Sequence, residues 1–344
     1  MKQDAKQLLD LAKGWMKQGN TTVVFQLLRD ALKLNEADQD RMVGAMISKE
    51  LGRAFMQTGQ WDRADDAFRQ AATIYLYEAD YRGAAESIRN LANMKFQMGQ
   101  FGDCELLCDQ AVDLATKSGD FQLRATILNT QGALASIQGM QKESIKIFNL
   151  CLSDFRKAGN RLRQAYALHN IGLAYLELGQ FPETKKAFEE AMTMALENND
   201  TNLVEICYQN MAKLQLKTGD IVAARSLISA AEELLDTLKS PQLAADLAII
   251  KAMVYRQSGD QRQARTIIDR ALKLTRSNNL LQHEAELLYE LGCLEIETGE
   301  ASAARSSLEA AITLLKKTGG NQLKKAVEKL KSLEASAKNM IRAA

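Results

Sequence analysis

The sequence predicts an all-α protein: a right-handed superhelical solenoid of eight antiparallel helix pairs with a C-terminal capping helix. Three observations support this. Glycines recur every forty residues, small residues recur in the same register around them, and only two prolines interrupt the 344 residues. A fixed period of this size is typical of solenoids, in which each repeat packs only against its neighbours.

The register is set by eight glycines. They are Gly19, Gly59, Gly99, Gly139, Gly179, Gly219, Gly259 and Gly299. Alanine or glycine stands seven residues before each of them, and alanine or cysteine stands twelve residues after it. The residue nine positions after the glycine is large in most repeats. The small positions allow helices to approach closely, and the large ones fill the space between them.

The most regular repeat runs from Leu168 to Met192 and contains two apolar-periodic helical segments. Gly179-Gln180-Phe181-Pro182 joins them. Gly179 suits the left-handed position that ends a helix, and Pro182 suits the first turn of the next, where no backbone hydrogen bond is lost. The repeat is therefore predicted to be a helix, a tight turn and a second helix.

The other repeats are looser copies of this one. The first covers about residues 2 to 36, and its turn at residues 19–22 offers a threonine cap for the second helix. Residues 42–78 form the next most regular repeat. Repeats three and four lose the aromatic residue of the first helix at Lys95 and Ala135, and repeats six and eight lose it at Gln215 and Glu295. Residues 1–318 are expected to form one solenoid.

The segment 319–344 departs from the repeat pattern. It carries an apolar stripe at Leu323, Val327, Leu330 and Leu333, with lysines elsewhere. A terminal helix must cover an apolar face on one side and meet water on the other, so a capping helix is predicted. A basic helix on a membrane surface is the alternative, although the apolar side lacks Trp and Phe.

Composition limits the partners and the compartment. A net charge of +1 gives no whole-molecule case for nucleic acid, and no run of about eighteen apolar residues predicts a membrane span. The N-terminal residues MKQDAKQLLDLAKG read as the first repeat's own helix, not as a signal peptide. Five cysteines, an odd number, indicate a reducing compartment, so we expect a cytoplasmic protein without nucleic-acid or membrane partners.

Metal binding, cofactor binding and catalysis find little support. Cys104 and Cys108 lie four residues apart, but both occupy core positions of the repeat, where free cysteine packs as a small hydrophobe. A zinc site needs about four ligands, and His169 and His283 stand in other repeats. No glycine-rich phosphate loop or nucleophile with its base is recognisable. We expect no cofactor, no metal and no enzyme.

These features resemble the tetratricopeptide repeat (TPR) over nearly the whole chain. The residues that carry the resemblance are Leu168, Gly172 and Tyr175 in the first helix, Gly179 and Phe181 in the turn, and Thr184, Phe188 and Ala191 in the second helix. Repeats of forty residues, longer than the common thirty-four, resemble those of Leu-Gly-Asn repeat proteins, kinesin light chains and bacterial peptide-sensing regulators.

The resemblance implies a concave groove lined by the first helix of each pair, through positions ten, nine and six residues before the turn glycine. The candidate peptide-binding residues at these positions are Lys49, Arg53, Arg89, Asn90, Asn93, Asn129, Asn170, Asn210 and Lys213. An apolar groove patch is expected at Ile249, Ile250 and Met253. The groove is thus predicted to be cationic early, rich in amides in the middle, and apolar late.

The groove predicts a module that binds an extended peptide of a protein partner. A carboxamide offers both donors and acceptors, so the asparagines could pair with any peptide backbone. Arginine pairs bidentately with carboxylate, which favours a partner with an acidic group or a C-terminal carboxylate. The asparagines could instead form a solvated polar face or contact adjacent helices. The functional alternative is a scaffold that assembles with itself or with a folded partner through its ends or its convex surface, and a homo-oligomer stays open.

Overall fold

The computed structural model describes residues 4–318 and 322–343, with side chains described as far as residue 335. Contacts divide the chain into two compact units, Met1–Asn160 and Arg161–Ala344, each considered by itself. The first unit contains α1 (Ala5–Lys17), α2 (Thr21–Asp38), α3 (Arg41–Gln57), α4 (Trp61–Tyr77), α5 (Tyr81–Gln97), α6 (Phe101–Ser118), α7 (Phe121–Ile137) and α8 (Gln141–Lys157).

The second unit continues the same alternation. It contains α9 (Arg161–Glu177), α10 (Phe181–Glu197), α11 (Thr201–Thr218), α12 (Ile221–Leu238), α13 (Pro241–Gln257), α14 (Gln261–Ser277), α15 (Leu281–Glu297), α16 (Ala301–Thr318) and α17 (Leu323–Ala343). The predicted all-α class, with eight antiparallel pairs and a final helix in a TPR-like solenoid, is confirmed over the described residues. One solenoid over residues 1–318 stays a prediction, as does the superhelical hand.

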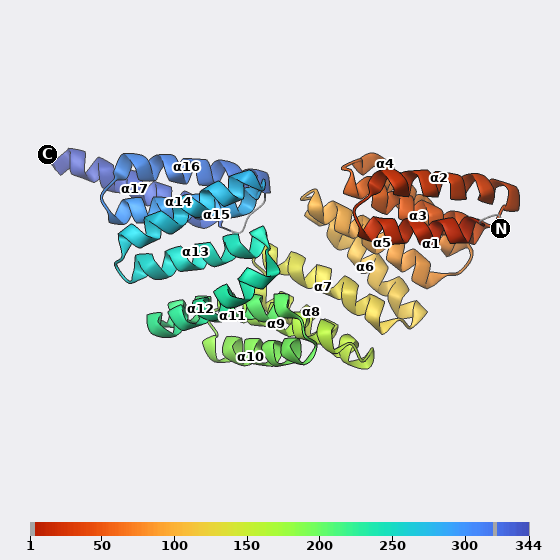
Figure 1. Ribbon diagram of the computed structural model, residues 1–344, viewed down its shortest axis with the longest axis horizontal. Helices are drawn as coiled ribbons and strands as arrows, with labels where there is room; N and C mark the ends of the chain where they lie inside the picture. The colour runs from red at the N-terminus through yellow and green to blue at the C-terminus, as the bar shows by residue number, and fades with distance from the viewer. Residues whose placement is uncertain (1–3, 319–321, 344) are drawn as a thin grey trace. The chain divides into compact units, whose positions relative to one another are not determined.

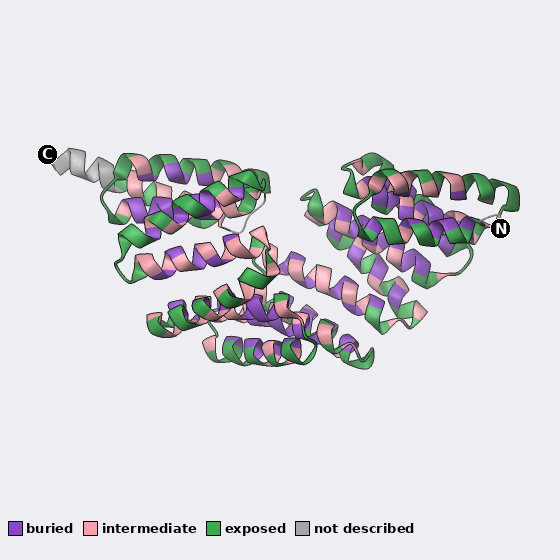
Figure 2. Cartoon of the chain, in the orientation of Figure 1, coloured by how far each residue is buried: buried purple, intermediate pink, exposed green. Residues whose placement is uncertain are grey.

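The odd-numbered helices form one layer within each unit. Each odd helix from α1 to α15 packs on the even helix that follows it. The odd helices from α1 to α7 and from α9 to α15 also contact the next odd helix in their series. Figure 2 shows the buried residues on the facing sides of paired helices, with exposed residues on their outer sides. The concave groove that the resemblance implied along the first helix of each pair stays a prediction.

The turns follow the predicted backbone chemistry. The eight register glycines have φ between +71° and +86°, a region that glycine enters without steric cost. Pro182 lies in the first turn of α10, as expected. The threonine cap predicted for α2 is wrong: Asn20 is the N-cap and its Oδ1 accepts from the Val23 N–H at 3.3 Å, while Thr21 is already helical. Asparagine competes well for this position because its side-chain oxygen reaches the same amide.

The two helices of a repeat meet at one size-matched pair of residues. A Cβ at Gly172 would lie 2.6 Å from Phe188 Cδ1, and Gly132 stands in the same relation to Phe148. Where the first position of this pair is alanine, the second is Leu, Cys or Ile instead of Phe. The pairs, in chain order, are Ala12 with Leu28, Gly52 with Phe68, Ala92 with Cys108, Gly132 with Phe148, Gly172 with Phe188, Ala212 with Ile228, Ala252 with Ile268, and Gly292 with Leu308. The small residue sets how closely the helices approach, and the large one fills the gap.

The last helix, α17, packs on α16. Ala326 is fully buried in a cluster with Ala285 and Leu315, and Leu323 packs against this cluster. This agrees with a capping role. Gly319 and Gly320, at the start of the predicted capping segment, lie outside the described residues. None of the described helices combines the length and the apolar composition needed to cross a bilayer.

Replacing Gly172 by alanine is expected to destabilise the protein by about 1 to 3 kcal/mol, because the new Cβ must displace the ring of Phe188 from a filled core. Gly14 is the matched control, since it is also helical but a methyl group added there would have no heavy atom within 4 Å. Gly14→Ala should stabilise by roughly 0.5 to 1 kcal/mol, from helix propensity alone. Urea unfolding followed by circular dichroism measures both. Equal effects of the two substitutions would contradict the close approach.

Candidate functional site

In the first unit, two of the three predicted basic residues are neutralised within the chain. Lys49 on α3 forms an ion pair with Glu86 on α5. Arg53 Nη1 donates to Glu50 Oε2 at 2.8 Å, and Glu50 is almost fully buried. Both cations lie on the layer of odd helices, as predicted, but their nearest anions are residues of this protein.

Arg89 on α5 differs from them. Its Nη2 donates to Asn90 Oδ1 at 3.2 Å, and its buried Nε has no hydrogen-bond partner. Arg89 forms no ion pair within residues 4–318 and 322–335. Burial lowers the pKa of this guanidinium, Glu86 opposes that effect, and Arg53 adds to it. Arg89 is therefore a partly buried cation with a buried, unpaired Nε, and its charge is poorly compensated.

The amides of the first unit already contact neighbouring groups. Asn90 is buried, and Asn93 Oδ1 accepts from Thr130 Oγ1 on α7 at 3.3 Å. Asn129 is partly exposed on α7 and also has an interaction within the protein. An amide has more hydrogen-bonding positions than one such contact uses, so Asn93 keeps capacity for a ligand.

In the second unit, the amide row is built around a histidine. Asn210 Nδ2 lies 2.8 Å from His169 Nε2 and donates to the Ile206 carbonyl at 3.1 Å. Both side chains are buried, and burial lowers the pKa of His169 to about 4, although a hydrogen bond with Asn170 opposes this. A neutral His169 can accept from the Asn210 amide. This pair links α9 to α11. It is a contact between adjacent helices, which was the alternative to peptide binding for the asparagines.

The predicted apolar groove patch is largely wrong. Ile250 is fully buried and Ile249 is 4% exposed, and both belong to core clusters between helices. Only Met253 on α13 is partly exposed. Lys213 on α11 is also partly exposed. Ile250 is buried like Asn90 and Asn210, which also stand nine residues before a turn glycine, whereas Asn170 at the same position is partly exposed. The sequence pattern did not separate these buried and exposed positions.

Sequence reasoning missed a buried carboxyl group, Glu205 on α11. Gln209 Nε2 donates to Glu205 Oε1 and to the Leu243 carbonyl, the latter at 3.1 Å, while the buried Glu205 Oε2 has no hydrogen-bond partner. Burial raises the pKa of Glu205 to about 7, although the hydrogen bond from Gln209 opposes this. The equivalent residue is alanine in the seven other repeats: Ala5, Ala45, Ala85, Ala125, Ala165, Ala245 and Ala285. That break in an alanine column was the signal.

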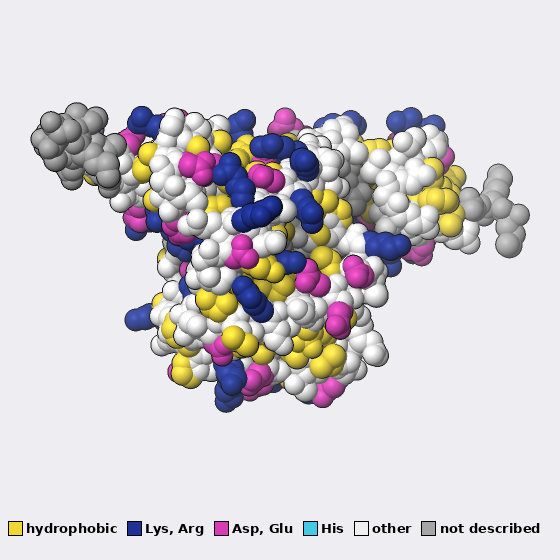
Figure 3. Space-filling view, turned by 60° about the vertical axis from the view of Figure 1, so that its left-hand side comes forward, with side chains coloured by type: hydrophobic (Ala, Val, Ile, Leu, Met, Phe, Trp, Pro, Cys, Tyr) yellow, Lys and Arg dark blue, Asp and Glu magenta, His cyan; other side chains and the backbone are white. Residues whose placement is uncertain are grey.

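Further ionisable groups with shifted pKa values lie on α13 and α15 of the second unit. His283 Nε2 lies 3.5 Å from Asp246 Oδ1, and this contact raises the pKa of His283 against the effect of burial. Burial also raises the pKa of Glu290, while its ion pair with Arg256 at 3.2 Å opposes the change. Figure 3 shows basic and acidic side chains interspersed on one face of the molecule.

The side chains do not form a metal site within the part of the chain that the structure describes, because no three His, Cys, Asp or Glu residues come together there as a ligand group. Cys104 and Cys108 are fully buried in the core cluster of α5, α6 and α7, at the repeat positions that predicted this.

Three segments of the chain match family models described as tetratricopeptide repeat: residues 49–75, 164–197 and 245–278. The fold and these matches together define a helical-repeat protein. More particularly, the chain is a TPR repeat protein that resembles kinesin light chain-related proteins and the Rap and NprR bacterial regulators.

Two curated relatives illustrate this. Protein KINESIN LIGHT CHAIN-RELATED 3 of Arabidopsis thaliana is 22% identical over 285 residues, which cover 79% of this chain and 44% of that protein. Regulatory protein RapG of Bacillus subtilis (strain 168) is 23% identical over 171 residues, which cover 49% of this chain and 46% of that protein. The chain thus spans less than half the length of these relatives.

Solved structures share the fold at low identity. A Rap protein complexed with competence and sporulation factor has a TM-score of 0.68 and 15% identity, covering 93% of this chain and 90% of that one. Aspartyl phosphate phosphatase F from Bacillus subtilis has a TM-score of 0.70 and 15% identity, covering 93% and 86%. At such identities the likeness shows the fold and carries no activity across.

Replacing Glu205 by glutamine is expected to stabilise the protein at pH 8 by about 1 to 3 kcal/mol. In the folded protein the pKa is raised from 4.5 to about 7, so the contribution of this group to stability is fully present below about pH 4.5 and is lost as the pH rises through about 7. Glutamine does not ionise, so the variant does not lose this stability as the pH rises. The variant and the unchanged protein should therefore differ little in stability near pH 4.5.

Urea unfolding from pH 4.5 to 8 measures the difference. Glu233→Gln, at an exposed position of α12 in the same unit, is the control and should leave the pH profile unchanged. A Glu205→Gln profile parallel to that of the unchanged protein would contradict the raised pKa.

Proposed function

We propose that this TPR protein is a non-catalytic interaction module that binds an extended segment of a protein partner on the faces of its odd helices. The observation that carries the proposal is Arg89, a partly buried arginine whose buried Nε has no hydrogen-bond partner and which has no carboxylate partner among the described residues. A buried charge that lacks a partner is costly, so a carboxylate supplied by a ligand would gain more there than at an exposed arginine.

The surroundings of Arg89 suit a peptide carboxylate. Arg53 contributes a second positive charge, since it acts on the pKa of Arg89. Asn93 lies on the next turn of α5, and its Nδ2 donates no hydrogen bond within the described residues, so it could bond a peptide carbonyl. A side-chain or C-terminal carboxylate at Arg89 would then fix the register of an adjoining backbone.

The amides of the second unit are assigned a smaller part. Asn210 holds His169, so its loss would disturb the α9–α11 contact itself. We keep Asn170, with Lys213, as the ligand contacts proposed for this unit. Binding here is proposed separately for each unit.

The relatives support an interaction role at a coarser level. One structure of similar fold is described as a Rap protein in complex with competence and sporulation factor, and RapG is described as a regulatory protein. Aspartyl phosphate phosphatase F shares the fold as well. We propose no catalysis here, because His169 is buried and bonded to Asn210 while His283 is paired with Asp246.

Arg89→Gln with Asn93→Ala is expected to weaken partner binding at least about tenfold, since a hydrogen-bonded charge pair is worth roughly 1.5 to 3 kcal/mol. The partner would be captured from native lysate of the source organism with the intact chain, identified by mass spectrometry, and titrated as a purified protein. Arg29→Gln, which removes an exposed arginine from α2, is the control of equal charge change.

Circular dichroism must first show that all three proteins are equally helical. Equal affinity of the double variant and the intact chain would rule out Arg89 as the anchor. If Arg29→Gln also lost binding, the loss in the double variant would be explained by net charge and not by a specific contact of Arg89.

A further inference from the structure

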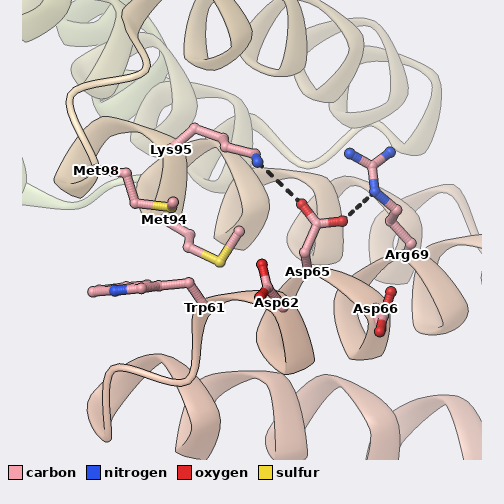
Figure 4. Close-up of a pocket in the computed structure, with 8 residues that line it drawn as sticks. All are labelled: Trp61, Asp62, Asp65, Asp66, Arg69, Met94, Lys95 and Met98. Carbon is pink, nitrogen blue, oxygen red and sulfur yellow. Dashed lines mark hydrogen bonds and ion pairs between the residues drawn. The ribbon is translucent and has the colours of Figure 1, made fainter.

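A pocket of about 320 Å³ lies between α4 and α5 of the first unit, in the lower part of the range for ligand sites, roughly 300 to 1,000 Å³. Eight residues line it: Trp61, Asp62, Asp65, Asp66, Arg69, Met94, Lys95 and Met98. Figure 4 shows the indole of Trp61 nearly edge-on, with the side chains of Met94 and Met98 on one side of it and Asp62 beside it. The pocket therefore has a flat aromatic wall, a thioether wall and an acidic end.

The charges of the pocket do not balance. Asp65 holds both cations, with Arg69 at Oδ2 and Lys95 Nζ 3.3 Å from Oδ1 (Figure 4). Asp62 and Asp66 are exposed, and neither forms a hydrogen bond or an ion pair within the described side chains. Three carboxylates against two cations leave one negative charge, and the buried Asp65 Oδ1 accepts no hydrogen bond.

The repeat architecture does not require these residues. Asp62 and Asp66 stand three and seven residues after their glycine, and no other repeat has an acidic residue at either position. Tryptophan two residues after the glycine also occurs only here. In the next repeat along, the equivalent positions are Phe101, Gly102 and Leu106. A feature that seven repeats fold without is not needed for packing.

We propose that this pocket receives an arginine side chain of a protein partner. A guanidinium is planar and weakly hydrated, so it can stack on the Trp61 indole while its N–H groups pair with Asp62 and Asp66. Met94 and Met98 would cover its other face and its aliphatic stem. The same helix already shows this kind of contact, because Arg63 lies 4.1 Å from the ring centroid of Phe55.

The site is independent of the proposed peptide-binding face. It shares no residue with the positions ten, nine and six before the glycine on α3 or α5. It combines the second helix of one repeat with the end of the first helix of the next, so it would bind a basic group whether or not Arg89 binds a carboxylate.

The two tryptophans of the chain make a direct test possible. The indole N–H signals of Trp15 and Trp61 would be followed by NMR during titration of the intact chain with N-acetyl-arginine-N′-methylamide. We expect the Trp61 signal to shift with a dissociation constant on the order of 1 to 10 mM, and the Trp15 signal to stay in place. The citrulline analogue, which has nearly the same shape without the charge, should shift neither.

Asp62→Asn with Asp66→Asn should weaken arginine binding about three- to tenfold, as expected for two exposed ion pairs. The control Asp38→Asn with Asp113→Asn changes net charge equally at exposed sites of the same unit. Equal shifts with citrulline, with a blocked phenylalanine, or at both tryptophans would overturn the proposal. So would the absence of any shift at about 50 mM probe, well above the expected dissociation constant.

Discussion

The contact on which the rest of the structure depends is the meeting of a small residue on the first helix with a large one on the second. Gly172 against Phe188 and Gly132 against Phe148 leave no room for a methyl group. Where the first residue is Ala92, the second is the small Cys108. At the glycine positions the facing ring leaves no space for a Cβ, and a core at crystal-like density tolerates an extra methyl group poorly.

That contact also determines which surfaces can be functional. Within each unit, an even helix packs against its own odd helix and against the next one, so its inner side belongs to the core. The odd helix has a further face, but part of that face contacts the next odd helix. Asn90, Asn210 and Ile250, all nine residues before the glycine, are buried there. Arg53, Asn93 and Met253, three positions further on, are at least partly exposed. A ligand would therefore meet the later position more readily than the earlier one.

The sequence predicted the architecture well because periodicity encodes it directly. The turn glycines, the small and large core positions and Pro182 lie where expected. The site was predicted less well, because a helical position tells which side a residue faces and not how near the neighbouring helix comes. Ile249 thus appeared exposed although it lies in the core, and the partners of Asn210 and Arg53 could not be foreseen. Both depend on the reach of particular side chains across adjacent helices.

Departures from the register are the more informative signal in a repeat protein. Residues that recur in every repeat are explained by packing, whereas Glu205, Arg89 and the pair Asp62 and Asp66 are not. These residues differ in how far they are exposed to solvent. Glu205 and Arg89 are charges in low-dielectric surroundings, so each shifts its own pKa and gains strongly from a partner. Asp62 and Asp66 lie in water, so their pairing is weak and screened by salt, and the Trp61 wall must supply the rest of the affinity. A partner that used both Arg89 and the Trp61 pocket would therefore lose affinity with salt mainly through the pocket.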